Sequence, residues 1–219
     1  MKNNLTEKDI EVLNKWAEAY DIDELKIKDK EKIFNLEELH ISNDNLTELP
    51  KEIGILTNLK ILDIECYKLK ELPKEIFNLI NLEELYIRNN LTELPKEIEN
   101  LTNLKILDID YYNLNELPKE IFNLINLEEL DISSHNLTEL PKEIGNLTNL
   151  KRLDIRTNNF TKLPKEIGNL INLKELSIDI NIDINIINKD FNFKSFPIEE
   201  IGKLNNLKDL SIRIRKWEK

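Results

Sequence analysis

Leu-Pro-Lys-Glu-Ile at Leu49–Ile53 is the first of six copies of this pentapeptide, which begin 23, 22, 23, 23 and 23 residues apart. The other copies are Leu72–Ile76, Leu94–Ile98, Leu117–Ile121, Leu140–Ile144 and Leu163–Ile167. A fixed period in the twenties indicates a solenoid, in which each unit buries its apolar side chains only against its neighbours. The repeat therefore predicts the architecture, while it says little about which partner the surface of the solenoid would bind.

The stretch Leu127–Asn149 shows what one unit is expected to form. Leu130 and Ile132 alternate with polar residues, which predicts a short strand with one buried face. Leu140 and Pro141 end the extended run, because proline fixes its own φ and keeps the preceding residue out of the helical region. Pro141 suits the first position of a helical turn. Each unit should therefore contain a strand, a loop, a short helical or 3₁₀ turn, and a return loop.

The pattern Leu-x-x-Leu-x-Ile-x-x-Asn-x-Leu-x-x-Leu-Pro-x-x-Ile-x-x-Leu resembles the leucine-rich repeat family, and in particular its bacterial 23-residue type with Leu-Pro-x-x-Ile. The resemblance covers the chain from about Leu36 onward. It implies an α/β solenoid: a right-handed horseshoe with a parallel sheet on the concave side, short helical or 3₁₀ turns on the convex side, and an N-terminal helical cap. The family is overwhelmingly a protein-recognition scaffold. Unit starts alternate between Glu-Glu-Leu, as after Leu36 and Leu82, and Lys-Ile-Leu, as after Leu59 and Leu104.

Three segments are expected along the chain. Residues 1–35 should form an N-terminal helical cap with a truncated first rung. Residues 36–206 should form seven leucine-rich units, the last with an insertion at about 180–192. Residues 207–219 should form a C-terminal strand and cap, since a solenoid has to cover the apolar surface at its ends.

The two ends carry their own signals. Thr6 and Asp9 resemble a capping box ahead of a helix. The spacing Ile22-x-x-Leu25-x-Ile27 repeats the strand pattern and predicts the truncated rung. At the other end, the side chains expected to form the last strand and close the core are Leu210, Ile212, Ile214 and Trp217.

The insertion begins with the strictly alternating stretch Asp179–Ile186, which predicts a strand longer than its neighbours. In parallel register, Arg213 should lie beside Asp179, and Arg215 beside Asn181, so that opposite charges favour the pairing. The same stretch is similar to the start of a calcium loop, but it lacks the required glycine and the flanking helices. We therefore expect no metal there.

The charge balance limits the partners. The 219 residues include 42 acidic and 31 basic side chains, for a net charge of −11. Such a chain is not expected to bind nucleic acid or an anionic membrane, since both attract basic surfaces. With no apolar run at the N-terminus and a single cysteine, we expect a cytoplasmic protein. Export by a route that needs no signal peptide is the open alternative.

Candidates for catalysis are few. His40 and His135 lie four repeats apart, about 19 Å at the spacing of stacked strands, which is too far to share a metal or to form a dyad. Cys66 has no histidine near it in the repeat pattern and is interpreted as a packing residue. The chain has only four glycines and no Gly-rich phosphate loop. We expect no enzymatic activity, no cofactor and no metal.

The third, fifth and seventh positions of each unit should point out of the concave sheet. Together they hold twelve acidic and four basic residues, so the acidity is concentrated on the face that such folds use for binding. A field of one sign steers partners of the opposite charge. The predicted protein-binding residues are Glu84, Tyr86, Arg88, Asp108, Asp110, Tyr111, Glu129, Asp131, Arg152, Asp154 and Arg156.

Tyrosines lie near one edge of this face. Family members usually carry Asn at the ninth position of the unit, where these units hold Tyr67, Tyr112 and other residues. Two interpretations of Tyr67, Tyr111 and Tyr112 stay open. They are exposed interface anchors, or two of the three are buried fillers that replace the asparagine.

The sequence therefore predicts a non-catalytic, monomeric interaction scaffold that binds a protein or peptide with a basic surface. Reversal of Asp108, Asp131 and Asp154 to lysine is expected to abolish binding with the fold intact. One alternative is a secreted bacterial effector or surface protein that binds a host molecule. Another is a self-assembly module in which the edge strands Asp179–Ile186 and Ser211–Arg215 pair between chains.

Overall fold

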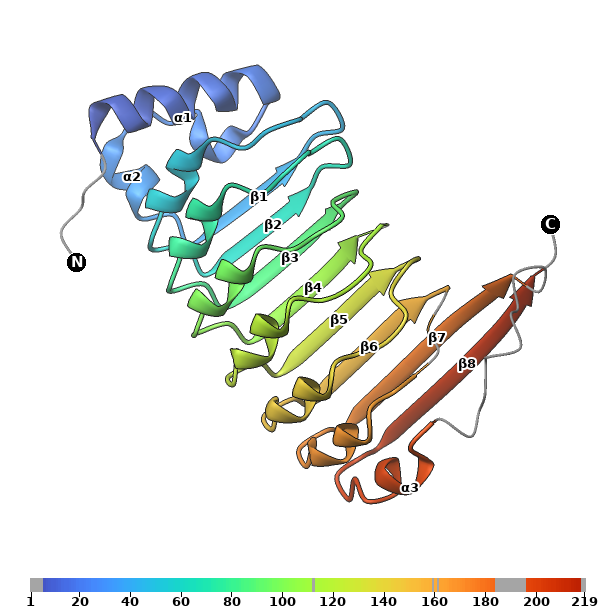
Figure 1. Cartoon of the computed structure of the whole chain (residues 1–219). Helices are drawn as coiled ribbons and strands as arrows, with labels where there is room; N and C mark the ends of the chain where they lie inside the picture. Colours follow the sequence, from blue (N-terminus) through green and yellow to red (C-terminus); the bar gives the residue numbers. More distant parts are fainter. Residues whose placement is uncertain (1–5, 112, 159, 161, 184–195, 218–219) are drawn as a thin grey trace.

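The computed structural model describes residues 6–111, 113–158, 160, 162–183 and 196–217. Within them, eight parallel strands form one open sheet in which each strand pairs with the next along the chain (Figure 1). The predicted α/β solenoid with a parallel sheet is confirmed. The strands are β1 (Glu38–Ser42), β2 (Ile61–Glu65), β3 (Glu84–Asn89), β4 (Ile106–Tyr111), β5 (Glu129–Ser134), β6 (Arg152–Thr157), β7 (Glu175–Asp183) and β8 (Asp209–Trp217).

Each Leu-Pro-Lys-Glu-Ile copy forms a single 3₁₀ turn behind the sheet. In the first copy, Pro50 caps the turn, and the amide of Ile53 donates to the Pro50 carbonyl oxygen at 3.1 Å. The proline is thus one residue earlier than predicted, at the cap rather than in the turn. The turns are η2 (Lys51–Ile55), η3 (Lys74–Asn78), η4 (Lys96–Asn100), η5 (Lys119–Asn123), η6 (Lys142–Asn146) and η7 (Lys165–Asn169).

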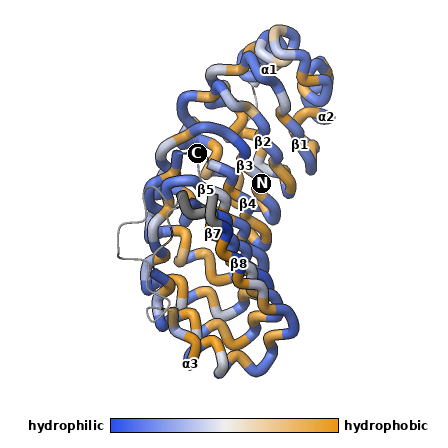
Figure 2. The backbone as a smooth tube through the Cα atoms, turned by 90° about the vertical axis from the view of Figure 1, so that its right-hand side faces the viewer, coloured by the Kyte–Doolittle hydropathy of each residue, from blue (hydrophilic) through white to orange (hydrophobic). Residues whose placement is uncertain are grey.

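One continuous apolar core lies between the sheet and the turns. In β2, Leu62 and Ile64 are fully buried while Asp63 is only half-buried, and β3, β4, β5 and the described part of β7 repeat this alternation. Hydrophobic residues recur in each coil of the chain (Figure 2). Helices long and apolar enough to cross a membrane are absent from the part of the chain that the structure describes.

The N-terminal end is covered by the helices α1 (Glu7–Tyr20) and α2 (Lys30–Phe34) (Figure 1). The capping box is confirmed: the amide of Asp9 donates to Thr6 Oγ1 at 3.2 Å, and the amide of Thr6 donates to Asp9 Oδ2 at 2.8 Å. The predicted strand at Ile22–Ile27 is wrong. Residues Asp23–Leu25 form a 3₁₀ turn, η1, which lets the neighbouring apolar side chains reach the core without an extended backbone.

The C-terminal end differs from the expected cap. β7 and β8 pair with Asp179 beside Arg213 and Asn181 beside Arg215, which confirms the predicted register. β7 is therefore an internal strand and not an edge, and residues 184–186 of its predicted extension lie outside the described residues. The short helix α3 (Ile198–Ile201) precedes β8.

The last strand does not close the core. Leu210 is 49% exposed, and Ile212 and Ile214 are half-buried, because no further unit packs against this end of the described structure. The division into residues 1–35, 36–206 and 207–219 stays a prediction.

Candidate functional site

The face of the sheet that points away from the 3₁₀ turns carries the odd positions of each strand, and we call it the open face. The register of neighbouring strands places one row of side chains side by side across β2 to β6. That row consists of Asp63, Tyr86, Asp108, Asp131 and Asp154. The predicted convergence of carboxylates on this face is thus present.

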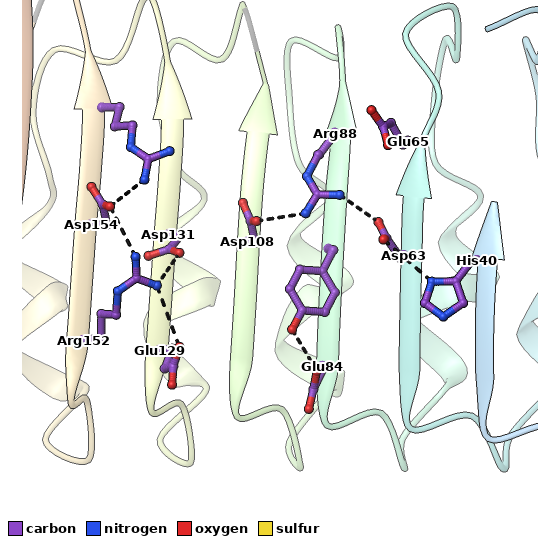
Figure 3. A network of polar contacts seen from close by, with 12 residues as sticks. His40, Asp63, Glu65, Glu84, Arg88, Asp108, Glu129, Asp131, Arg152 and Asp154 are labelled. Atoms are coloured by element: carbon purple, nitrogen blue, oxygen red, sulfur yellow. Dashed lines mark hydrogen bonds and ion pairs between the residues drawn. The ribbon is translucent and has the colours of Figure 1, made fainter. Parts of the chain in front are cut away.

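Arg88 on β3 bridges two of these carboxylates (Figure 3). Its guanidinium nitrogens lie 3.3 Å from Asp63 Oδ1 and 3.4 Å from Asp108 Oδ2. The same group lies 5.8 Å from the centre of the Tyr86 ring, and the Tyr86 hydroxyl donates to Glu84 Oε2 at 2.8 Å. Burial and the neighbouring Glu84 carboxylate raise the pKa of Tyr86, so this hydroxyl stays protonated at neutral pH.

Arg152 on β6 organises a second cluster (Figure 3). Its guanidinium lies 2.8 Å from Asp131 Oδ2, 3.4 Å from Asp154 Oδ2, 3.6 Å from Glu175 Oε2 and 3.8 Å from Glu129 Oε2. Arg156 adds a contact of 2.7 Å to Asp154 Oδ2. Arginine suits this position because its planar group donates in several directions at once.

Between the two clusters lies a hollow of about 250 Å³. Burial raises the pKa of Asp108 and of Asp131, and the nearby Arg88 and Arg152, respectively, oppose that rise. Both carboxylates are therefore held partly out of water at an energetic cost. The hollow is lined by Arg88, Asp108, Asp110, Asp131, Ile132, Ser133, Asp154 and Arg156.

Among the residues that line the hollow, two carboxylate oxygens have unused hydrogen-bonding capacity. Asp131 Oδ1 and Asp154 Oδ1 are buried and accept no hydrogen bond from any described residue. Buried acceptors of this kind are costly unless a donor reaches them. Asp110, by contrast, is exposed, and among the described residues it forms no ion pair.

Two of the predicted binding residues are not accessible. Tyr111 is completely buried, so the prediction that it lines the binding surface is wrong. Asp154 is only 6% exposed, beneath its contacts with Arg152 and Arg156. The remaining predicted residues are half-buried or exposed on the open face, namely Glu84, Tyr86, Arg88, Asp108, Asp110, Glu129, Asp131, Arg152 and Arg156.

Tyr111 is buried because the strand alternation continues to the eighth position of the unit, which therefore faces the core. Cys66 and Ser134 occupy the same position in their units and are buried too. The Ser134 hydroxyl donates to the Leu114 carbonyl oxygen at 2.6 Å, and the Cys66 thiol lies 3.5 Å from the Ile41 carbonyl oxygen. The ninth position points outward, and Tyr67 there is 44% exposed. Tyr112 lies outside the described residues.

A second polar row, which the repeat pattern did not lead us to predict, lies at the entry edge of the strands. There an asparagine side chain of each unit bonds the backbone of the unit before it; for example, Asn126 Nδ2 donates to the Thr102 carbonyl oxygen at 2.8 Å. The six other asparagines with this contact are Asn58, Asn81, Asn103, Asn149, Asn172 and Asn206. The signal was the asparagine that directly precedes the first leucine of each unit.

These asparagines line a groove of about 1190 Å³ together with alternating glutamates and lysines. The charges are paired across neighbouring units, with Lys60 Nζ 2.8 Å from Glu37 Oε2 and Lys151 Nζ 2.6 Å from Glu128 Oε2. The alternation of glutamate and lysine at the second position of the unit, from Glu37 to Lys151, produces these pairs. Over that stretch the charges of the groove are balanced, unlike those of the open face.

The histidines and the cysteine do not form a site. His40 lies on β1 with Nδ1 3.7 Å from Asp63 Oδ2, while His135 lies four units away, after β5. Burial raises the pKa of the Cys66 thiol, which disfavours the reactive thiolate. Groups of three or more side chains that could hold a metal ion do not occur among the residues described.

Comparison with known proteins identifies the repeat. The family profile described as "Leucine-rich repeat region" matches residues 10–112 and 95–219. A comparison with curated proteins gives no match.

Solved structures with the same coil come from bacteria and plants. A leucine-rich repeat protein of Leptospira interrogans is 30% identical, with a TM-score of 0.55; the match covers 85% of this chain and 57% of that one. The plant peptide hormone receptor RGFR1, solved in complex with RGF2, is 32% identical with a TM-score of 0.65 over 84% and 29% of the two chains. Internalin C2 of Listeria monocytogenes is 22% identical with a TM-score of 0.65, covering 85% and 76%, and shows the fold alone. The chain therefore spans little more than half of the Leptospira protein and less than a third of the plant receptor.

Proposed function

This chain belongs to the leucine-rich repeat proteins, and from that premise we propose that it is a non-catalytic scaffold that binds a protein or peptide with a basic surface through its open face. The family and its solved members support a role in protein binding. The plant peptide hormone receptor was solved in complex with RGF2, which supports a role in recognition for a chain of this fold. The choice of face and of partner charge is our own and comes from the side chains.

The observation that carries the proposal is the excess of carboxylates on the open face. Across β2 to β6 this face holds eight carboxylates and three arginines. The arginines neutralise part of the charge through the contacts of Arg88, Arg152 and Arg156, and the excess stays negative. Such a field attracts a basic partner over distances of about a Debye length, roughly 8–10 Å at moderate salt.

The hollow between the two arginine clusters gives the face a specific contact point. A lysine or arginine side chain of the partner that enters it would meet the exposed carboxylate of Asp110. It would also lie beside the half-buried carboxylate of Asp131, which lines the same hollow. A charge-assisted hydrogen bond there would be of the stronger kind.

The best substitution for testing the open face is at a carboxylate that contacts no arginine of the same chain. Asp108, Asp131 and Asp154 all contact arginines of the same chain, so their reversal to lysine is expected to disturb the face itself. Asp110→Lys is the cleaner perturbation, because Asp110 is exposed and in no ion pair with a described residue. Glu93→Lys is its matched control: it makes the same change in net charge at an exposed site in the loop before η4.

We would immobilise the native chain and both variants and capture proteins from bacterial extracts and from animal or plant cell extracts in parallel. The parallel extracts are needed because the alternative of a secreted protein acting on a host molecule differs only in the source of the partner. The proposal expects a basic protein that binds the native chain and Glu93→Lys, and that binds Asp110→Lys about ten-fold more weakly. Equal capture by all three, or a captured partner without a basic surface, would overturn it.

A further inference from the structure

The outer edge of β8 leaves apolar side chains exposed in the described structure. Among the described strands, β8 is the last in the sheet, and none pairs with its far side (Figure 1). Leu210 is 49% exposed there, whereas its counterparts in the other strands, such as Leu176 of β7, are buried. Ile198 of α3, near the start of the same strand in Figure 1, is 60% exposed. We propose that a second copy of this chain covers this edge, with the two β8 strands antiparallel across a two-fold axis.

Backbone geometry determines which residues face the edge. The amide of Asp209 donates to the Lys174 carbonyl oxygen at 3.0 Å, so the peptide groups of Asp209 point toward β7. Successive residues of a strand point their N–H and C=O groups to opposite sides. The N–H and C=O groups on the outer side therefore belong to Leu210, Ile212, Ile214 and Lys216, and an antiparallel partner has to bring its own residues of this set opposite them.

Several symmetric registers satisfy this condition, and the side chains select one. A two-fold axis at Arg213, Ile214 or Arg215 would place arginines directly opposite each other, which is unfavourable. An axis at Leu210, Ser211 or Lys216 would shorten the paired stretch. An axis at Ile212 pairs Asp209 of each copy with Arg215 of the other, Leu210 with Ile214, and Ile212 with itself. In that register both ends of the ladder hold opposite charges, and the apolar residues lie on one side.

The apolar side of this ladder is the core side. Leu210, Ile212 and Ile214 are in register with the buried residues Leu176, Ile178 and Ile180 of β7. Residues directly opposite in an antiparallel pair point to the same side of the sheet. The two cores would therefore join, and the two open faces would lie on one side of a continuous sheet.

A head-to-tail stack is disfavoured by the other end of the molecule. Parallel pairing of β8 with β1 of the next copy would place Asp209 opposite Glu38, two like charges, and α1 and α2 lie at that end (Figure 1). Contact between identical surfaces closes as a dimer, whereas a head-to-tail contact grows into a filament. The proposal replaces the monomer expected from the sequence and is independent of which partner the open face binds.

Charge swaps test both the dimer and its register. Asp209→Arg places two arginines at each end of the ladder, and Arg215→Asp places two aspartates there. Each variant alone should weaken dimerisation about ten-fold or more, since two favourable pairs become repulsive. An equimolar mixture should recover the native affinity as a heterodimer, because each introduced charge then faces its opposite.

Sedimentation velocity with one variant fluorescently labelled measures all three species. Within one chain, Asp209→Arg replaces a like-charged neighbour of Glu175 with an opposite charge, while Arg215→Asp loses the 3.0 Å contact with Asp179. Circular dichroism melting therefore accompanies the measurement, and recovery in the mixture excludes misfolding as the cause of the loss. Glu38→Lys at the opposite end should leave dimerisation unchanged. A native chain that stays monomeric up to about 100 μM, a mixture without heterodimer, or oligomers that grow without limit would overturn the proposal.

Discussion

Replacing Arg152 with methionine should show how much of the open face depends on one guanidinium. Methionine keeps much of the apolar stem but removes the contacts to Asp131 at 2.8 Å and Asp154 at 3.4 Å. The side chain of Arg152 is 35% exposed, and that of Asp154 is 8% exposed. Exposed ion pairs contribute roughly 0.2–1 kcal/mol each, and breaking a buried pair costs roughly 3–5 kcal/mol. Because this cluster lies between the two cases, we expect a loss of about 2 kcal/mol in the free energy of unfolding.

The pH dependence provides a second test of the same reasoning. Burial raises the pKa of Asp131, and Arg152 opposes that rise, so the variant should raise it further. A carboxyl whose pKa is higher in the folded state destabilises the fold above that pKa, and this penalty disappears below the unfolded value of about 4. The deficit of the variant should therefore be complete near pH 7 and shrink as the pH falls toward about 4.

Urea unfolding followed by circular dichroism at both pH values measures the deficit. Arg156→Met is the graded comparison: it contacts only Asp154, is 60% exposed, and should lose about 1 kcal/mol. Lys151→Met removes a surface pair with Glu128 and should lose less. A deficit for Arg152→Met below about 0.5 kcal/mol near pH 7, or one that does not change with pH, would refute the reasoning.

Two further predictions concern the core. Gly54→Ala should destabilise the chain by about 2 kcal/mol or more in urea unfolding, since its new Cβ would lie 2.2 Å from the Glu75 carbonyl oxygen. Gly202→Ala is the control and should be nearly neutral, because the nearest atom to its new Cβ lies 3.4 Å away. Equal effects of the two substitutions would contradict the close packing of the turns. Cys66 should not react with a thiol reagent near pH 8 until the chain is unfolded, because it is fully buried and its thiol pKa is raised; rapid labelling of the native protein would show that its rung opens.

The repeat made most of the architecture predictable, because period and phase are visible in the residues themselves. The alternation of Leu130 and Ile132 with polar residues correctly placed a buried and an open face on each strand. The same rule, continued one step further, would have placed Tyr111 in the core with Cys66 and Ser134. Strand parity therefore decides which side of the sheet the eighth position takes, whatever residue the neighbouring ninth position holds.

Interactions across the sheet were harder to predict than the sheet itself. Register placed Asp154 next to Asp131, but its burial depends on the rotamers of Arg152 and Arg156, which the sequence does not encode locally. At the N-terminus, a spacing of apolar residues that fits a strand also fits the 3₁₀ turn that forms at Asp23–Leu25. Short apolar patterns leave this choice to the tertiary environment.

The alternating lysines and glutamates along the asparagine-lined groove have a consequence for how such a chain can change its length. From Glu37 to Lys151, the second position of each unit alternates between glutamate and lysine, and Lys174 then ends the alternation. Within that stretch, adding or deleting a single unit would bring two like charges into contact at the junction, whereas a block of two units restores every pair. Insertions and deletions that survive selection should therefore come in pairs of units, and a designed extension of this scaffold should be built in the same step.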